Sequence, residues 1–236
     1  GVWAIDYLIG GRPNSRGVRP CPGLPKGKVI NLYGLESSGK TTMALTWAAA
    51  VQRQGGSVAY IDCEHEVSLH QMVQLGIDIT SDRFVLYQPE TIEQALTLAW
   101  AMVTAGVDLV IYDSVGASMS KAELEKNSDM EAHAKVGEMA KKWSEKLPGI
   151  HNRCAASGSI FVGISQVRMN IGVMGHGEKT TVQGGLAWKF YPALRIRLTS
   201  MFKEKENVYN AMTNSSEEKV VASSVKAKLD KCKVSG

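Results

Sequence analysis

Short apolar runs alternate with longer amphipathic runs along most of the chain. Runs rich in β-branched and aromatic residues are typical of buried strands, and they occupy residues 28–33, 57–62, 83–87, 108–113 and 159–166. Alanine-rich or amphipathic runs typical of helices occupy residues 42–51, 91–105 and 129–147. This alternation predicts an α/β fold, with a mostly parallel twisted sheet and helices on both of its faces.

Capping and helix-breaking residues set the expected boundaries. Thr91 is a good N-cap for the helix at 91–105, and Gly106 ends it. The helix at 129–147 is expected to stop at Pro148, because proline lacks a backbone donor. Residues 194–198 alternate apolar and basic side chains, which predicts a strand with one wet or interfacial face. The amphipathic piece at residues 2–9 is expected to cover one edge of the sheet.

Composition narrows the class of protein. A chain of 236 residues with 44% hydrophobic content can build one large core. The net charge of +4 permits a polyanionic partner without requiring one. The four cysteines are scattered with no C-x-x-C, which is typical of reduced thiols in a cytoplasmic protein and not of a disulfide framework or zinc site. No apolar run is long enough to span a bilayer.

A phosphate-binding pattern joins the first predicted strand to the first predicted helix. The pattern G-x-x-x-x-G-K-T is made by Gly34, Leu35, Glu36, Ser37, Ser38, Gly39, Lys40 and Thr41. A glycine-rich loop leaves backbone N–H groups free to converge on an anion, and the following helix points its positive end at the same place. Lys40 can then reach the β- and γ-phosphates, and the Thr41 hydroxyl can ligate Mg²⁺. The spacing predicts a bound nucleoside triphosphate.

Polar side chains follow three further predicted strands. Asp113 ends the run at 108–113, where a carboxylate would hold Mg²⁺ through a water opposite Thr41. Glu64 and Glu66 follow the run at 57–62, and a carboxylate there can orient or deprotonate an attacking water, although spacing alone does not choose between them. Gln166 ends the run at 159–166. Its amide would either hydrogen-bond the γ-phosphate or lie at a solvated strand end.

The stretch from residue 167 to 185 is long, glycine-rich and without clear periodicity. Loops of this length in a compact domain are usually functional or disordered. Arg168 and Lys179 could neutralise phosphates, and the aliphatic side chains between them could insert between bases. The alternative is a mobile surface loop.

The order and spacing of these motifs resemble those of the RecA recombinases over most of the chain. The matching segments are residues 34–42, 60–65, 110–115, 166–174, 184–185 and 189–191. The resemblance implies an ATP- and Mg²⁺-dependent DNA recombinase that forms filaments on single-stranded DNA. It would pair that strand with a homologous duplex in recombination and DNA repair, with DNA-dependent ATP hydrolysis, in the cytoplasm of a bacterium or a phage-infected cell.

The resemblance also implies roles for individual residues. Glu64, and not Glu66, would activate water, and Gln166 would couple the γ-phosphate to DNA. Lys231 and Lys233 would reach the nucleotide of the neighbouring subunit, or they belong to a solvated basic tail. The phosphate-binding loop would extend to Thr42. Subunit-interface positions are Lys189, Phe190 and Arg195.

Two loops would bind DNA under the same resemblance. Residues 125–133 resemble the first DNA-binding loop. In the second, Arg168 would contact phosphate and Ile171 would insert between stretched bases. The DNA-binding set comprises Arg168, Met169, Asn170, Ile171, Gly172, Val173, Met174, Lys179, Gly184 and Gly185.

The chain departs from the family pattern at a few positions. Leu35 stands where proline is usual, and Ser165 stands where asparagine is common. Ser68 and Gln71 occupy positions where the family places an acid and an aromatic that packs on adenine, and His70 is a substitute candidate. Residues 1–236 are expected to form a single RecA-like ATPase core, without the family's N-terminal polymerisation arm and C-terminal domain. The competing interpretations are a ring-forming helicase-type ATPase and a non-catalytic ATP-binding regulatory module.

Overall fold

The computed structural model describes residues 2–11, 15–17, 23–117, 132–169, 180–210 and 215–234. Its strands form one sheet in the order β3-β2-β4-β5-β1-β7-β8, and β6 pairs with β5. The strands are β1 Val29–Gly34, β2 Val58–Asp62, β3 Phe84–Tyr87, β4 Leu109–Asp113, β5 Ile160–Met169, β6 Thr180–Val182, β7 Leu194–Asn210 and β8 Ser215–Cys232. Pairing is parallel from β3 to β7 and antiparallel for β7 with β8 and for β5 with β6. The predicted mostly parallel sheet is confirmed.

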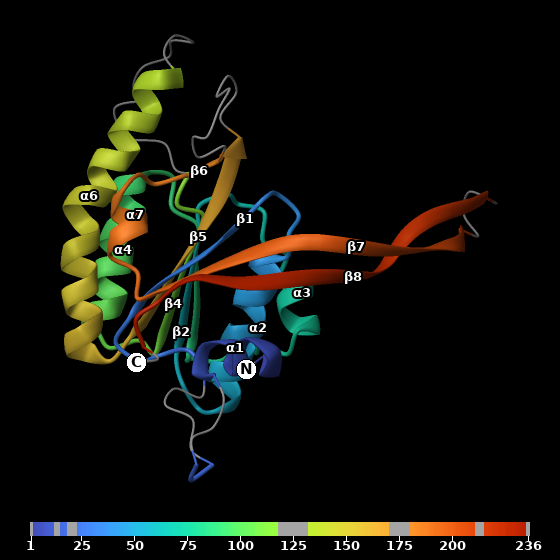
Figure 1. Ribbon diagram of the computed structural model, residues 1–236, viewed down its shortest axis with the longest axis horizontal. Helices are drawn as coiled ribbons and strands as arrows, with labels where there is room; N and C mark the ends of the chain where they lie inside the picture. The colour runs from blue at the N-terminus through green and yellow to red at the C-terminus, as the bar shows by residue number, and fades with distance from the viewer. Residues whose placement is uncertain are drawn as a thin grey trace.

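Helices cover both faces of this sheet, as predicted (Figure 1). They are α1 Trp3–Gly10, α2 Lys40–Arg53, α3 Leu69–Gln74, α4 Ile92–Thr104, α6 Ala132–Ser157 and α7 Ala187–Phe190. The core beside α2 contains Leu45, Ala48 and the aliphatic face of β1. The core beside α4 and α6 contains a cluster of aromatic rings from Tyr112, Trp143, Phe161 and Trp188. Two apolar faces on one sheet explain why the strand runs read as continuously hydrophobic.

Helix α4 follows its sequence signals, whereas α6 does not. The Thr91 hydroxyl accepts a hydrogen bond of 3.2 Å from the Gln94 amide and caps α4 as predicted. The prediction that the later helix stops at Pro148 is wrong, because α6 continues to Ser157. Leu147, Ile150 and Cys154 are fully buried on one face of α6. Apolar burial on both sides of Pro148 therefore outweighs the backbone hydrogen bond that the proline removes.

The hairpin of β7 and β8 is much longer than the strand predicted at residues 194–198. The two strands pair from Leu194 with Cys232 to Asn210 with Ser215, and the hairpin projects far beyond the sheet and helices (Figure 1). Residues 201–207 are exposed. A two-stranded ribbon exposed to solvent on both faces does not need alternating apolar and polar residues. That alternation is the signal from which strands are predicted, so the sequence did not reveal the outer part of the hairpin.

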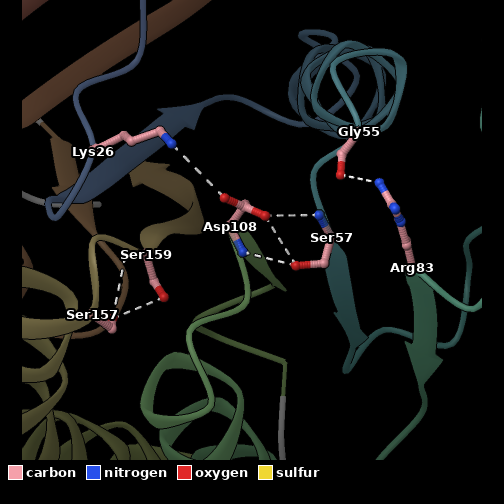
Figure 2. Close-up of polar contacts among 7 residues, drawn as sticks. All are labelled: Lys26, Gly55, Ser57, Arg83, Asp108, Ser157 and Ser159. Carbon is pink, nitrogen blue, oxygen red and sulfur yellow. Dashed lines mark hydrogen bonds and ion pairs between the residues drawn. The ribbon is translucent and has the colours of Figure 1, made fainter.

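Polar side chains join the amino ends of two neighbouring parallel strands. Figure 2 shows the edge where the parallel strands begin, and there Asp108 accepts hydrogen bonds of 2.9 Å from the Ser57 amide and 3.1 Å from its hydroxyl. Lys26 lies 3.9 Å from the other Asp108 oxygen. These contacts tie the starts of β2 and β4 together.

None of the described helices is long and apolar enough to cross a membrane.

Candidate nucleotide-binding site

The loop between β1 and α2 is a tight turn that ends directly in a helix N-terminus. Ser37 and Gly39 adopt left-handed conformations with φ of 56° and 83°. A Cβ on Gly34 would lie 2.3 Å from the Leu198 carbonyl oxygen and 2.6 Å from the Ser38 hydroxyl, so only glycine fits there. Helix α2 begins at Lys40, which directs its first backbone N–H groups toward the loop.

Two polar groups inside this loop are suited to phosphate. The Ser38 hydroxyl is buried and has no hydrogen-bond partner among the described residues, and a phosphate oxygen would satisfy it. The Lys40 ammonium donates to the Leu35 carbonyl at 2.8 Å. Burial lowers the Lys40 pKa, and the charges of Asp113, Glu64 and Glu36 oppose that change. An ammonium has three donors, so Lys40 retains donors for phosphate oxygens.

The Asp113 carboxylate lies beside the first turn of α2. Its Oδ2 accepts hydrogen bonds from the Thr41 hydroxyl at 2.9 Å and from the Tyr60 hydroxyl at 2.7 Å. Burial raises the pKa of Asp113 to about 6, and the two hydrogen bonds oppose the rise. A hydroxyl and a carboxylate at this separation offer the oxygen ligands that Mg²⁺ prefers. Within the described residues no cluster of three or more His, Cys, Asp or Glu forms a separate metal site.

Tyr60 is a member of the site that the sequence reasoning missed. It is fully buried in β2, and burial, followed by the adjacent Asp113 carboxylate, raises its pKa well above the usual value. A tyrosine in a buried strand needs a partner for its hydroxyl. That requirement was the available signal, because the neighbouring strand ends in an acid.

Glu64 is the carboxylate that the fold brings to this site. Its Oε1 accepts a hydrogen bond from the Ser114 hydroxyl and one of 3.3 Å from the Gln166 side-chain amide. Glu66 is exposed. Glu64 and Ser114 follow β2 and β4, and Gln166 lies in β5, so the parallel pairing of these strands brings the three residues together. The sequence reasoning assigned Ser114 no role, and only the adjacency of these strands supplies one.

The segment expected near a nucleobase lies beside α2. The side-chain amide of Gln71 donates to the Thr42 hydroxyl at 3.4 Å. The Ser68 hydroxyl caps α3 by accepting a hydrogen bond of 3.4 Å from the backbone N–H of Gln71, and His70 is exposed. Of these three residues, the structure brings Gln71 to the phosphate-binding helix.

The positions expected at a subunit interface gather on another part of the sheet. Lys231 donates to the carbonyls of Lys189 at 3.2 Å and Phe190 at 2.5 Å. The Phe190 side chain is 62% exposed. Arg195 lies 4.7 Å from the Tyr33 ring centroid, and the Lys233 amide donates to the Ala193 carbonyl at 2.9 Å. Lys231 therefore lies at the end of β8 against α7, whereas Lys233 follows β8 with an exposed side chain and a backbone bonded to the segment after α7.

Most of the predicted DNA-binding loop lies outside the described residues. Asn170, Ile171, Gly172, Val173, Met174 and Lys179 fall there, as do residues 125–131 of the predicted first loop. The backbone of Arg168 and Met169 pairs with Thr181 and Thr180 of β6. Gly184 and Gly185 adopt φ of 92° and 77°. They lie so close to Trp188 and Ala140 that a Cβ would clash.

Comparisons with known proteins agree with these motifs. The model of the RecA N-terminal domain family matches residues 15–235. Protein RecA of Oleidesulfovibrio alaskensis is 40% identical over 190 residues, which is 79% of this chain and 53% of the relative. Protein RecA of Helicobacter pylori is 38% identical over 213 residues, which is 90% of this chain and 57% of the relative. The chain thus spans about half the length of the curated relatives it matches.

Among solved structures, a crystal structure of the RadB recombinase is similar in fold. The TM-score is 0.57 at 22% sequence identity, and the match covers 77% of this chain and 79% of the other. At that identity the likeness concerns the fold alone.

Proposed function

This chain belongs to the RecA family, and from that premise we propose that it is an ATP-dependent DNA recombinase. It binds ATP and Mg²⁺, assembles into helical filaments on single-stranded DNA, and pairs the bound strand with a homologous duplex. Hydrolysis of ATP is stimulated by DNA. The observation that carries the proposal is that three features meet at one edge of the sheet. They are the phosphate loop with Lys40, the neighbouring oxygens of Thr41 and Asp113, and the Glu64 carboxylate.

The phosphates are held by the loop from Gly34 to Thr42. Its backbone N–H groups and the N-terminus of α2 attract the anion, and Lys40 is positioned to donate to the β- and γ-phosphates. Mg²⁺ would be held by the Thr41 hydroxyl and, through a water, by the Asp113 carboxylate. When bound, Mg²⁺ and the triphosphate supply the electrophilic phosphorus and the neutralising charge that phosphoryl transfer needs.

Glu64 accepts the proton of the attacking water. Its Oε1 is already oriented by Ser114 and Gln166, so the carboxylate is positioned before the substrate arrives. Gln166 lies on β5, which continues into Arg168 and the predicted DNA-binding loop. A change in the hydrogen bonding of Gln166 is thereby transmitted along one strand to the DNA contacts. The nucleotide favours the state that grips DNA, and its hydrolysis releases that state.

The DNA and subunit contacts complete the proposed cycle. The single-stranded DNA is contacted by Arg168 through Met174, Lys179, Gly184 and Gly185. Contacts to the DNA backbone should dominate the affinity, so binding should weaken steeply with salt. Lys189, Phe190 and Arg195 contact the next subunit, and Lys231 and Lys233 approach its nucleotide. A head-to-tail interface that does not close produces a helical filament.

Negative-stain microscopy of the full-length protein tests this proposal. The sample contains single-stranded DNA and a slowly hydrolysed ATP analogue, with controls that omit each ligand. Helical filaments that require both ligands are the expected result. Closed rings would instead indicate a helicase-type motor, and isolated particles indifferent to DNA would indicate an ATP-binding module.

A further inference from the structure

A β-bulge interrupts the pairing of β7 with β8 near the end of β8. Arg195 pairs with Lys231 and Ile196 pairs with Leu229, which leaves Asp230 as the extra residue. An extra residue changes which side chains share a face of the strand. Leu229 packs into the core beside α2. Lys231 instead lies across from Arg195, on the opposite face of the sheet.

The Asp230 carboxylate fastens this bulge to two other strands. It accepts a hydrogen bond from the Tyr33 hydroxyl of β1. The same oxygen lies 2.9 Å from Nε of Arg197 on β7, and its other oxygen lies 3.1 Å from Nζ of Lys228. The Asp230 side chain is 15% exposed and Tyr33 is 1% exposed. Burial opposes ionisation of Asp230, but the donors and charges around it prevail and lower its pKa.

The basic side chains on this face differ in whether the Asp230 carboxylate lies beside them. Arg195 and Arg197 lie 4.7 Å and 5.4 Å from the Tyr33 ring centroid, and Asp230 compensates Arg197 and Lys228. Lys231 is bound differently, because its ammonium donates to backbone carbonyls at the end of α7. Burial and the charges of Lys233 and Arg195 lower the Lys231 pKa. Lys231 is therefore a fixed cation whose charge Asp230 does not cancel.

We infer that Asp230 is a positioning residue for the basic pair Lys231 and Lys233. By locking the bulge to Tyr33 and Arg197, its carboxylate fixes the register of the end of β8, with Lys231 on the α7 face of the sheet and Lys233 two residues farther along the chain. That is the face which, under the proposed function on which this inference rests, meets the phosphates of the neighbouring subunit's nucleotide. Asp230 acts through the lysines and does not itself touch the nucleotide.

Amide hydrogen exchange tests the positioning independently of any activity. In Asp230→Asn, exchange at residues 229–234 should quicken at least about tenfold, including the Lys233 amide that donates to Ala193. Tyr33→Phe, which keeps the ring and removes one donor, should show a smaller effect at the same residues. Glu218→Gln is the matched control, because it breaks the exposed ion pair with Lys205 farther out on the hairpin. Unchanged exchange in Asp230→Asn and Tyr33→Phe would overturn the inference.

Subunit mixing tests whether the positioned lysines act on the neighbour. Asp230→Asn alone should lower the kcat of DNA-stimulated ATP hydrolysis about tenfold, with KM for ATP within about twofold. Adding Glu64→Gln subunits should restore turnover, because they supply intact lysines to the unaltered sites of Asp230→Asn subunits. A loss that mixing does not restore would place the effect within one subunit and overturn the inference. A wild-type protein with no DNA-stimulated hydrolysis would overturn the proposed function instead, while the exchange measurement would still decide whether Asp230 holds the bulge.

Discussion

The Thr41 hydroxyl donates a hydrogen bond of 2.9 Å to the Asp113 carboxylate across 72 positions of sequence. Thr41 lies in the first turn of α2, which follows β1, and Asp113 ends β4, which is separated from β1 in the sheet by β5. Because parallel strands end at one edge, a loop motif and a distant strand-end acid meet without any local signal that joins them. This pair defines the expected magnesium site.

Replacing Lys40 tests the phosphate loop. Lys40→Ala should weaken ATP binding at least about 100-fold, equivalent to about 2.8 kcal/mol, because it removes a buried ammonium beside the phosphates. Titration calorimetry with ATP and Mg²⁺ measures the change. Lys26→Ala is the control, since Lys26 is 80% exposed at the opposite edge of the sheet. Tight ATP binding by Lys40→Ala would contradict the assignment of the loop.

The two carboxylates after β2 should differ in their importance for hydrolysis. Glu64→Gln should retain ATP binding and lose about 10²- to 10⁴-fold in turnover, the usual contribution of a general base. Glu66→Gln should be near wild type, because Glu66 is exposed. Single-turnover hydrolysis separates the chemical step from binding. The reverse pattern would transfer the role to Glu66.

Gly34 should tolerate no side chain. In Gly34→Ala the new Cβ meets the Leu198 carbonyl oxygen, which is backbone and cannot rotate away, and such overpacking costs about 1–3 kcal/mol. Gly137→Ala is a matched control, because a Cβ there meets nothing within 4 Å and the residue lies in α6. It should be neutral or stabilise by up to about 1 kcal/mol. Urea denaturation gives both values, and equal stability of the two variants would be inconsistent with this packing.

Asp113 should make the protein without ligand less stable as pH rises. Its pKa in the fold is about 6, against 3.8 ordinarily, so the folded state binds this proton more tightly than the unfolded state does. The stabilisation is complete below about pH 4 and is lost as pH rises through 6, with a total of about 3 kcal/mol. Asp113→Asn should therefore unfold at a higher temperature than wild type at pH 8 and at a similar one below about pH 4.

Mg²⁺ and ATP should reverse that difference at pH 8. They pair with the Asp113 charge and stabilise the wild type by mass action, whereas Asp113→Asn loses this gain. Thermal denaturation with and without the ligands at both pH values measures the effect. Identical pH profiles for the two proteins would show that burial of Asp113 does not affect stability.

Local patterns in the chain determined much of this protein. Apolar runs of strand length predicted the parallel core strands, the Thr91 cap predicted the start of α4, and the glycine spacing predicted the phosphate loop. These features depend on residues that are close in the sequence, so the sequence alone is sufficient to predict them. The carboxyl-edge positions of Asp113, Glu64 and Gln166 followed from the same strand ends.

Other features were decided only by the tertiary structure. Sequence spacing left Glu64 and Glu66 equivalent, and the adjacency of β2, β4 and β5 placed Glu64 beside Ser114 and Gln166. Apolar packing carried α6 through Pro148, and register across β7 and β8 made Asp230 a bulge residue facing Tyr33. Each of these depends on which distant segments are paired and in what phase. Such pairing is a property of the folded sheet, because a shift of one residue exchanges its two faces.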